Sequence, residues 1–315
     1  MEKGYSAFGL TLRSSFSLPG MAVAEADGLP PLDLDLETPA ALGAAWSGSL
    51  APEPWRGLLG DGNELTIAWG NDGDLLFDYG GGARFRLDPA RACLGCAPLE
   101  PDALAWQRVL FSRILPMVSL ALGREALHAS AVEMACGVVG IAAPSGSGKS
   151  TLAAELMRRG TPLFADDVLT LDRRNGGVEA YPGSPHANIG PVPAGSIEPE
   201  QLGTVLASFS EERWVQVRRL SRGSRRVAAI VLLERRPGLT LQAEALDASP
   251  LILAPYMLGL PDDEPEREGR RFALYSDLVE STALLRLTAD VAHGPAEVVD
   301  ALERALDPVA TQAAA

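Results

Sequence analysis

The most constraining feature of the sequence is the segment 143–151, which reads Ala-Pro-Ser-Gly-Ser-Gly-Lys-Ser-Thr. It follows an apolar run at 137–142, which is typical of a fully buried strand, and it precedes a helical pattern over 151–159. A buried strand, a glycine-containing loop and a helix in this order form a phosphate-binding loop of the Walker A type. The segment therefore predicts an α/β domain that binds a nucleoside triphosphate.

Each residue type in this loop has a physical task. Glycines free the backbone N–H groups to surround phosphate oxygens, the lysine reaches the β- and γ-phosphates, and the following hydroxyl ligates Mg²⁺. The sequence has 27 basic residues, and only Lys3 and Lys149 are lysines. The motif departs from its usual form in having Ala143 in place of the first glycine. The predicted nucleotide-binding residues are Ser145, Gly146, Ser147, Gly148, Lys149, Ser150 and Thr151, with ATP and Mg²⁺ as cofactors.

Composition excludes several classes of partner. The chain has 315 residues, 47% of them hydrophobic, which is enough for one large or two ordinary domains with buried cores. A net charge of −14 argues against nucleic acid or an anionic membrane as the main partner.

Because no apolar segment is long enough to span a bilayer and no signal peptide is visible, we expect a cytoplasmic protein. A homo-oligomer is compatible with the sequence.

The three cysteines do not form a recognisable site. Cys93 and Cys96 make a single CxxC pair, and Cys136 stands alone. A structural zinc site needs about four ligands, and a redox CxxC usually opens a helix. We therefore expect ordinary thiols in a reducing compartment.

The sequence predicts a β-rich N-terminal module at 1–100, a linking helix at 101–123, a nucleotide-binding domain at 124–309 and a disordered tail at 310–315. Strands are expected at 32–36, 64–69, 75–79 and 83–87, with a hairpin turn at 71–73. Pro116 should kink the helix or end its first half. In the second domain, strands are expected at 127–133, 137–142, 162–165 and 227–233, and a last helix begins at Pro295.

Two carboxylates follow the strand at 162–165. A right-handed crossover from the helix at 151–159 should return this strand parallel to 137–142, so that Asp166 and Asp167 lie at the phosphate loop. One carboxylate can hold Mg²⁺, and the other can take a proton from an attacking hydroxyl. The alternative is that both only organise metal and water, as in an ATPase.

His128 and a group of arginines are further candidates. If 127–133 and 137–142 form a hairpin that turns near Ala135, residue 128 faces residue 142, which predicts that His128 either orients Asp166 or contacts phosphate. Five arginines between 218 and 226 could stabilise the transferring phosphoryl group, grip an acidic substrate, or simply be a solvated face.

His128, the loop 145–150, Arg159-Gly160 and Ala165-Asp-Asp167 together resemble the catalytic half of the HPr serine kinase/phosphorylase family. That family shares its nucleotide-binding architecture with phosphoenolpyruvate carboxykinases, and the resemblance spans roughly 124–307. It implies an HPr-kinase-like nucleotide-binding domain beside the β-rich module, α+β overall. The chain is more similar still to the HPr-kinase-like proteins of lasso-peptide gene clusters, which phosphorylate a serine of a precursor peptide.

The resemblance implies a role for each matching residue. Asp166 would accept the proton of a substrate serine, Asp167 would support the metal together with Ser150, and His128 would line the site. Arg225 corresponds to the mobile-loop arginine of the family, with Arg226 as the competing assignment. The sequence thus predicts an ATP- and Mg²⁺-dependent kinase acting on a serine of a peptide or small protein. The alternatives are an HPr-type kinase/phosphorylase, a small-molecule kinase, or an ATP-binding regulatory module.

Overall fold

The computed structural model describes residues 4–24, 28–47, 54–58, 63–70, 73–80, 82–174, 176–190, 197–209, 212–261 and 265–313. It is mixed α and β, with several sheets, as predicted. The chain divides into two compact units, which are Met1–Gly123 with Leu260–Asp262 and Arg124–Gly259 with Asp263–Ala315. Among the described helices, none has the length and apolar character needed to cross a bilayer.

The first unit is built on one sheet in the order β3-β1-β2-β4-β9-β8-β7-β6-β5. Its strands are β1 (Gly4–Ala7), β2 (Leu10–Ser14), β3 (Val23–Ala24), β4 (Pro31–Leu36), β5 (Trp55–Leu58), β6 (Glu64–Trp69), β7 (Leu75–Tyr79), β8 (Ala83–Asp88) and β9 (Cys93–Pro98). Helix α1 spans Pro39–Ser47. The four strands predicted here are confirmed as β4, β6, β7 and β8, whereas part of the predicted turn at 71–73 lies outside the described residues.

The predicted helix at 101–123 is a continuous helical segment that belongs to the first unit. It comprises α2 (Leu104–Val109), a π-helical turn η1 (Leu110–Ile114) and α3 (Leu115–Ala121). A π turn directly precedes Pro116, so the regular α pattern is interrupted there, and proline has no N–H to continue that pattern. Ser119 Oγ donates to Phe8 O at 2.7 Å, which ties the helix to the sheet of its own unit.

The cysteines are free thiols, as predicted. Cys93 and Cys96 both lie on β9, three residues apart, so their side chains point to opposite faces of the strand and cannot pair. Burial raises the pKa of the Cys93 thiol to about 11, with Asp35 adding to the effect. Such a thiol is protonated and unreactive at neutral pH.

The second unit contains a large sheet and a small one. The large sheet follows the order β13-β11-β12-β19-β15-β14-β10-β21, with β22 on β19 and β20 on β22, and the small sheet follows β16-β18-β17. The strands are β10 (Glu125–Leu127), β11 (Ala129–Met134), β12 (Gly137–Ala142), β13 (Leu163–Ala165), β14 (Leu169–Arg174), β15 (Gly177–Tyr181), β16 (His186–Ile189), β17 (Gly203–Phe209), β18 (Glu212–Val217), β19 (Arg225–Arg235), β20 (Gln242–Ala245), β21 (Met257–Leu258) and β22 (Ala283–Ala289).

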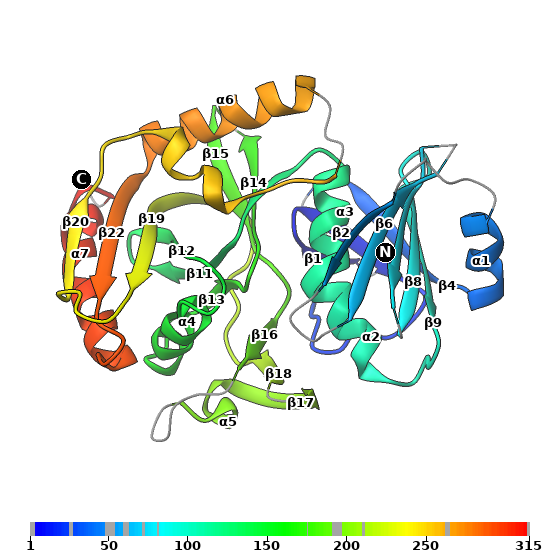
Figure 1. The fold of residues 1–315 in the computed structure, drawn as a ribbon, viewed down its shortest axis with the longest axis horizontal. Coiled ribbons are helices and arrows are strands. Elements are labelled where there is room, and N and C mark those ends of the chain that lie inside the picture. The colour runs from blue at the N-terminus through cyan, green and yellow to red at the C-terminus, as the bar shows by residue number, and fades with distance from the viewer. Residues whose placement is uncertain are drawn as a thin grey trace. The chain divides into compact units, whose positions relative to one another are not determined.

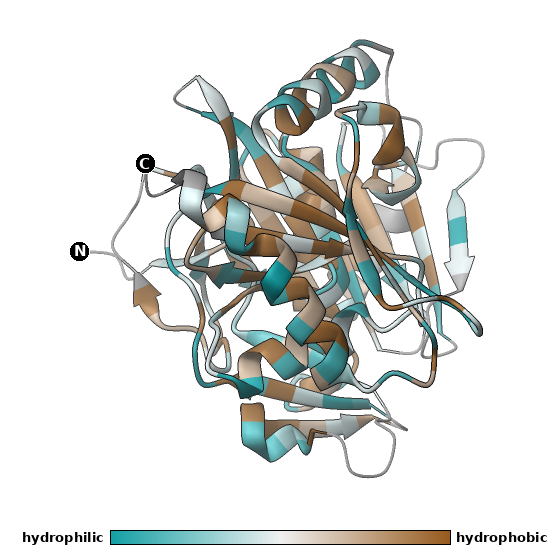
Figure 2. Cartoon of the chain, turned by 90° about the vertical axis from the view of Figure 1, so that its left-hand side faces the viewer, coloured by the Kyte–Doolittle hydropathy of each residue, from teal (hydrophilic) through white to brown (hydrophobic). Residues whose placement is uncertain are grey.

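Helices cover both faces of the large sheet (Figure 1). The helices of this unit are α4 (Lys149–Arg158), α5 (Pro199–Leu202), α6 (Pro265–Ser281) and α7 (Pro295–Ala313), with short 3₁₀ turns η2 (Pro250–Ile252) and η3 (Ala254–Tyr256). Along β12, Val138 and Ala142 pack in the cluster that includes α6, whereas Val139 and Ile141 pack with α4 and α7. A strand covered on both sides is apolar throughout, which is why the central strands are brown in Figure 2.

The strand predicted at 127–133 is in fact two strands, β10 and β11, separated at His128. The cause is a change of partner, since β10 pairs with β14 and β21 while β11 pairs with β12 and β13. The hairpin register is shifted by one residue from the prediction, because Ala129 and not His128 lies opposite Ala142. His128 therefore lies just beyond the ladder, where the chain passes from one set of strands to the other.

Strand β13 runs parallel to β12, as predicted, but the two strands are not neighbours. Strand β11 lies between them and is antiparallel to both. The C-terminal ends of β12 and β13 consequently lie at the same edge of the sheet, which brings 166–167 to the phosphate loop.

The end of the chain differs from the disordered tail predicted from residue 310. Helix α7 continues through Pro308 to Ala313, and residues 314–315 lie outside the described part of the chain. One face of α7 is buried in the core through Val298, Val299, Leu302 and Leu306. Packing of this face stabilises the helix, and the helix extends past residue 310, where the sequence predicted that order ends.

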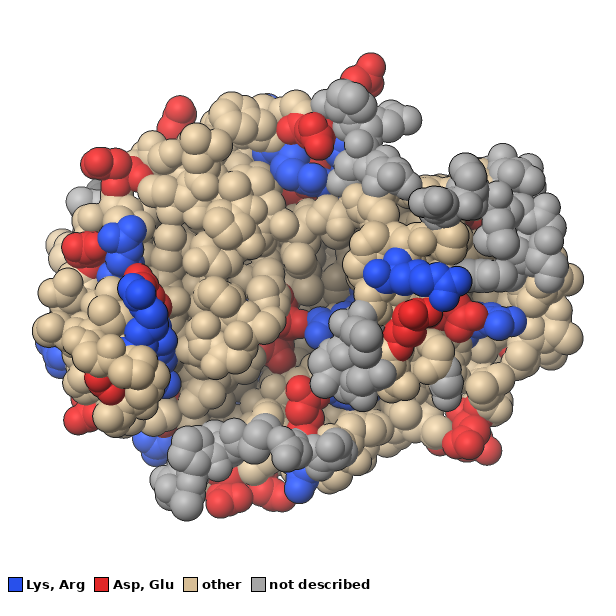
Figure 3. Space-filling model, in the orientation of Figure 1, with Lys and Arg blue, Asp and Glu red and all other residues tan. Residues whose placement is uncertain are grey.

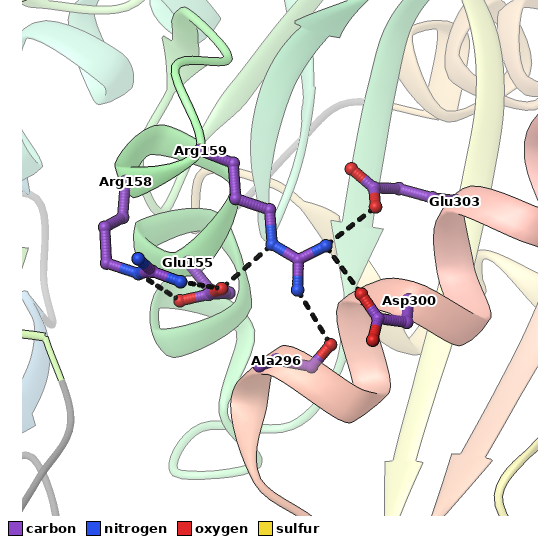
Figure 4. Close-up of polar contacts among 6 residues, drawn as sticks. All are labelled: Glu155, Arg158, Arg159, Ala296, Asp300 and Glu303. Carbon is purple, nitrogen blue, oxygen red and sulfur yellow. Dashed lines mark hydrogen bonds and ion pairs between the residues drawn. The ribbon is translucent and has the colours of Figure 1, made fainter.

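An ion-pair cluster fixes the orientation of α4 (Figure 4). The buried Glu155 carboxylate accepts hydrogen bonds from Arg158 at 2.6 and 2.8 Å and from Arg159 at 2.9 Å. These bonds, led by those from Arg158, lower the pKa of Glu155. Arg159 also reaches helix α7, through Ala296 O, Asp300 and Glu303. The helix that follows the phosphate loop is thus tied to the last helix of the chain.

The Glu155→Gln variant should lower the free energy of unfolding by about 1–3 kcal/mol, because two guanidinium groups lose their shared carboxylate. Chemical denaturation at pH 7 measures this difference. The matched control is Glu244→Gln, which breaks the exposed pair with Arg286 and should cost less than about 1 kcal/mol. The effect at Glu155 should shrink as the pH falls through its lowered pKa, because protonation removes the same charge. Equal losses in the two variants would contradict a special role for Glu155.

Candidate functional site

The loop between β12 and α4 has the backbone of a phosphate cradle. Gly146 and Gly148 adopt φ values of +77° and +96°, which side-chain-bearing residues rarely adopt. Gly148 is the N-cap of α4, and no side chain caps the first N–H groups of the helix. Ala143, the residue that replaces the first glycine of the motif, has no positive φ, and its methyl group lies in the core beneath α4. The alanine is therefore compatible with the loop.

The remaining loop residues lie around this cradle. Ser145 and Gly146 are exposed, and Ser147, Gly148 and Thr151 are partly buried. Four of the five, Ser145 being the exception, line a cavity of about 790 Å³ next to the loop.

Lys149 is buried, and its ammonium has three close acceptors. Lys149 Nζ lies 2.9 Å from Ala143 O, 3.4 Å from Pro144 O and 3.0 Å from His128 Nε2. Burial lowers the pKa of Lys149, while Asp167 and Asp166 oppose that effect. A charged lysine can only donate hydrogen bonds, so a neutral His128 must accept at Nε2 and carry its proton on Nδ1.

His128 links the lysine to Asp167. Its Nδ1 lies 3.1 Å from Asp167 O and 3.2 Å from Asp167 Oδ1, and its backbone N–H donates to Tyr256 O at 2.7 Å. The expectation that His128 orients Asp166 is thus modified, because the histidine contacts the second carboxylate of the pair.

Asp166 has a different set of partners. Ser130 Oγ and Ser150 Oγ donate to Asp166 Oδ1 at 3.2 and 3.3 Å, and the Asn188 N–H donates to Oδ2 at 2.9 Å. Burial and, next, the charge of Asp167 raise the pKa of Asp166 to about 6, although these three bonds act in the other direction. Asp166 is therefore ionised at neutral pH but far more basic than an ordinary aspartate.

A strained turn separates the two carboxylates. Asp167 has a φ of +67°, and the Val168 N–H donates to Asp166 O at 2.8 Å across it. This is the rarer form of the γ-turn, and such backbone costs about 1–3 kcal/mol. Because of this turn, the Asp166 carboxylate faces Ser150 at the start of α4, whereas the Asp167 carboxylate faces His128.

The oxygens at the start of α4 fit a magnesium ion. Ser150 Oγ lies beside the acidic pair, where it donates to Asp166 Oδ1, and hydroxyl and carboxylate oxygens are ligands that Mg²⁺ takes alongside substrate phosphates and water. The hydrogen bond of Ser150 is to Asp166, and the predicted pairing of Ser150 with Asp167 at the metal stays a prediction. Within the described residues, no group of three or more acidic, histidine or cysteine side chains could hold a metal by itself.

The structure does not bring Arg225 to the site, which corrects its expected role. Arg225 begins β19, which runs parallel to β12, and the residue level with the end of β12 is Leu232. Seven residues of strand separate the two positions, or roughly 23 Å at 3.3 Å per residue. Arg225 lies instead near Glu133, at 3.3 Å. The neighbouring Arg226, opposite Glu179 in the ladder, lies at the same remote end.

Sequence reasoning missed three residues at this edge, namely Ser130, Asn188 and Arg235. Ser130 lies two positions after His128 and could have been found from the hairpin register. Asn188 lies on β16, a strand within a segment rich in glycine and proline. Arg235 ends β19, and the rule that parallel strands bring their C-terminal ends to the ligand side could have identified it.

Charged side chains of both signs are interspersed on the surface. On the face in Figure 3, basic and acidic side chains of the described residues lie next to each other in small groups. Several of the arginines are paired with carboxylates, including Arg13 with Asp33 and Arg286 with Glu244.

Comparison of the sequence with protein-family models finds no match, and comparison with curated proteins finds none either. Among solved structures, the chain matches the Hpr(Ser) kinase/phosphatase from Coxiella burnetii with a TM-score of 0.29 and 13% identity, over 57% of this chain and 95% of that chain. With so low a TM-score, this match does not establish a shared fold, and the family resemblance stays a prediction.

The Asp167→Asn variant should lower the pKa of Asp166 below its wild-type value of about 6, because the charge of Asp167 is the second largest cause of the shift. A carboxyl-detected NMR titration of ¹³C-labelled protein measures both values. The exposed Asp307→Asn variant on α7 is the control and should leave the titration of Asp166 unchanged. An unshifted midpoint in Asp167→Asn would show that the two carboxylates are not electrostatically coupled.

Proposed function

We propose that the protein is an ATP- and Mg²⁺-dependent phosphotransferase that moves the γ-phosphoryl group to a serine hydroxyl, with a peptide as the acceptor. The single observation that supports transfer is the gathering of Lys149, Ser150 and a basic Asp166 at the start of one helix. An ammonium, a metal-binding hydroxyl and a proton acceptor are the parts that phosphoryl transfer to an alcohol requires.

In this proposal, the N–H groups of the loop and of the first turn of α4 bind phosphate oxygens. Lys149 exchanges its carbonyl and histidine acceptors for the β- and γ-phosphates. Ser150 and Asp167 would hold Mg²⁺, which supplies positive charge to the phosphates and leaves Asp166 available as the proton acceptor. Positioning and electrostatic stabilisation account for most of the rate enhancement in such sites.

Asp166 accepts the proton of the attacking hydroxyl. A pKa near 6 suits this task, since the group is ionised at neutral pH and still has appreciable basicity. His128 holds Asp167 through Nδ1 and Lys149 through Nε2, so it keeps the lysine and the second carboxylate in fixed positions before the nucleotide enters.

The peptide acceptor is the finer part of the proposal. It rests on the resemblance of the loop, His128 and the aspartate pair to the kinases of lasso-peptide precursors. The test incubates the protein with radiolabelled ATP, carrying the label on its γ-phosphate, Mg²⁺ and either a library of serine peptides or a pool of metabolites. Label on serine peptides supports the proposal. Label on small molecules would contradict the peptide acceptor alone, and label only as free phosphate would contradict transfer.

Two variants should separate binding from chemistry. Lys149→Ala should abolish ATP binding and transfer together, because no other ammonium is available in the loop. Asp166→Asn should bind ATP nearly as the wild type does, but transfer phosphate about 10²–10⁴-fold more slowly, since the proton acceptor is lost. Calorimetry and label transfer measure the two properties. Undiminished turnover in Asp166→Asn would remove Asp166 from the role of base.

The rate of transfer should increase with pH, because Asp166 has a raised pKa and must be ionised to accept a proton. Only the ionised carboxylate can accept a proton, so kcat/KM should be low in acid, rise through about pH 6 and level off above it. A stopped assay from acid to slightly alkaline pH, at saturating Mg²⁺, measures the profile. If kcat/KM instead rises entirely near the pKa of an ordinary aspartate, well below pH 6, the assignment of Asp166 as the base is contradicted.

A further inference from the structure

A cavity of about 790 Å³ lies beside the phosphate loop. The loop at 146–148 forms one wall, and the chain between β22 and α7 forms another, with Arg235 between them. Asp166 follows β13, on one side of β12 in the sheet order, whereas Arg235 ends β19 on the other side. The cavity and the acidic pair thus flank the phosphate loop from opposite directions.

The guanidinium of Arg235 packs against the backbone of the loop. A Cβ atom added at Gly148 would lie 3.4 Å from Arg235 Nη1 and 3.7 Å from its Cδ. Because Gly148 has no side chain, the guanidinium can approach the loop at the position that caps α4. The positive charge therefore lies directly beside the N–H groups expected to surround phosphate.

Backbone carbonyls hold Arg235 in place without neutralising it. Its Nη2 donates to His293 O at 2.6 Å and to Val291 O at 3.1 Å, with Asp290 O at 3.5 Å. Nε is buried and has no hydrogen-bond partner, and no ion pair joins Arg235 to a carboxylate within the described residues.

The other arginine of the cavity differs in this respect. Arg158 also lines the cavity, but two of its nitrogens bond to the Glu155 carboxylate. A guanidinium forms its strongest hydrogen bonds with anionic oxygens, often through two parallel N–H groups. Arg235 thus has a fixed position, a full charge and donors to spare at the edge of a cavity, which is the arrangement of an anion-binding group.

We propose that Arg235 binds the α- and β-phosphates of the nucleotide and that the nucleoside occupies the cavity. The triphosphate then runs from the cavity across the loop, with its terminal phosphate toward Asp166. A volume of about 790 Å³ lies within the range of small-molecule sites. Val291, which is 55% exposed, and Ile197 and Pro295 supply apolar surface for the base.

This inference rests on the proposed function, and it makes a separate claim about one residue. Loss of a charge-assisted contact to phosphate weakens binding by about 10- to 100-fold. Arg235→Ala should therefore weaken the binding of Mg²⁺-ATP and of ADP by that factor in calorimetric titrations. It should also reduce the dependence of affinity on salt, because one ionic contact is lost.

The matched control is Arg236→Ala. Arg236 is the next residue, is exposed and pairs with Glu234, so its removal should leave nucleotide affinity unchanged. Arg235→Gln is the second test variant, since it keeps a donor for the carbonyls of 290–293 but removes the charge. It should show the same loss of affinity and of salt dependence as Arg235→Ala, with a smaller loss of thermal stability in the absence of nucleotide.

The outcomes separate the two proposals. If the wild-type protein binds neither ATP nor ADP, the proposed function fails, and this inference fails with it. If the wild type binds and both Arg235 variants bind equally well, only the inference about Arg235 is overturned. Weaker binding with an unchanged salt dependence would also overturn it, because that result indicates a structural role for the carbonyl contacts and no contact with phosphate.

Discussion

The parallel pairing of β12 with β19, both buried on two faces, is the constraint on which the rest of the second unit depends. Parallel strands carry their C-terminal ends to the same edge, and helices then cover both faces. The phosphate loop after β12 and Arg235 at the end of β19 are neighbours for this reason. Strand β13, two positions away and running in the same direction, brings the acidic pair to the same edge.

Burial and charge together set the chemistry at that edge. Lys149 is buried and Asp166 is partly buried, and burial disfavours the charged form of each, so the pKa of the lysine falls and that of the aspartate rises. Their partners are distinct, because the strained turn at Asp167 sends one carboxylate to Ser150 and the other to His128. The proposed division between proton acceptor and support follows from this separation.

Local pattern predicted much of the fold, but it failed where long-range pairing decided the outcome. Strands such as β6, β7 and β12 were found at their observed bounds, since apolar periodicity and turn residues are local signals. The break at His128 was not found, because it arises from a change of partner strands. Arg225 was chosen for its place before a buried strand, and the direction of that strand puts it at the remote end.

By itself, the sequence determined the loop, its lysine and the order of strand, loop and helix, because glycine positions and apolar runs act over a few residues. Only the tertiary structure decided which side chains meet there. Ser130, Asn188 and Arg235 come from strands distant along the chain, and the turn at Asp167 decides that Ser150 contacts Asp166 while His128 contacts Asp167. Contacts of this kind depend on strand direction and register, which are set by packing of the whole sheet.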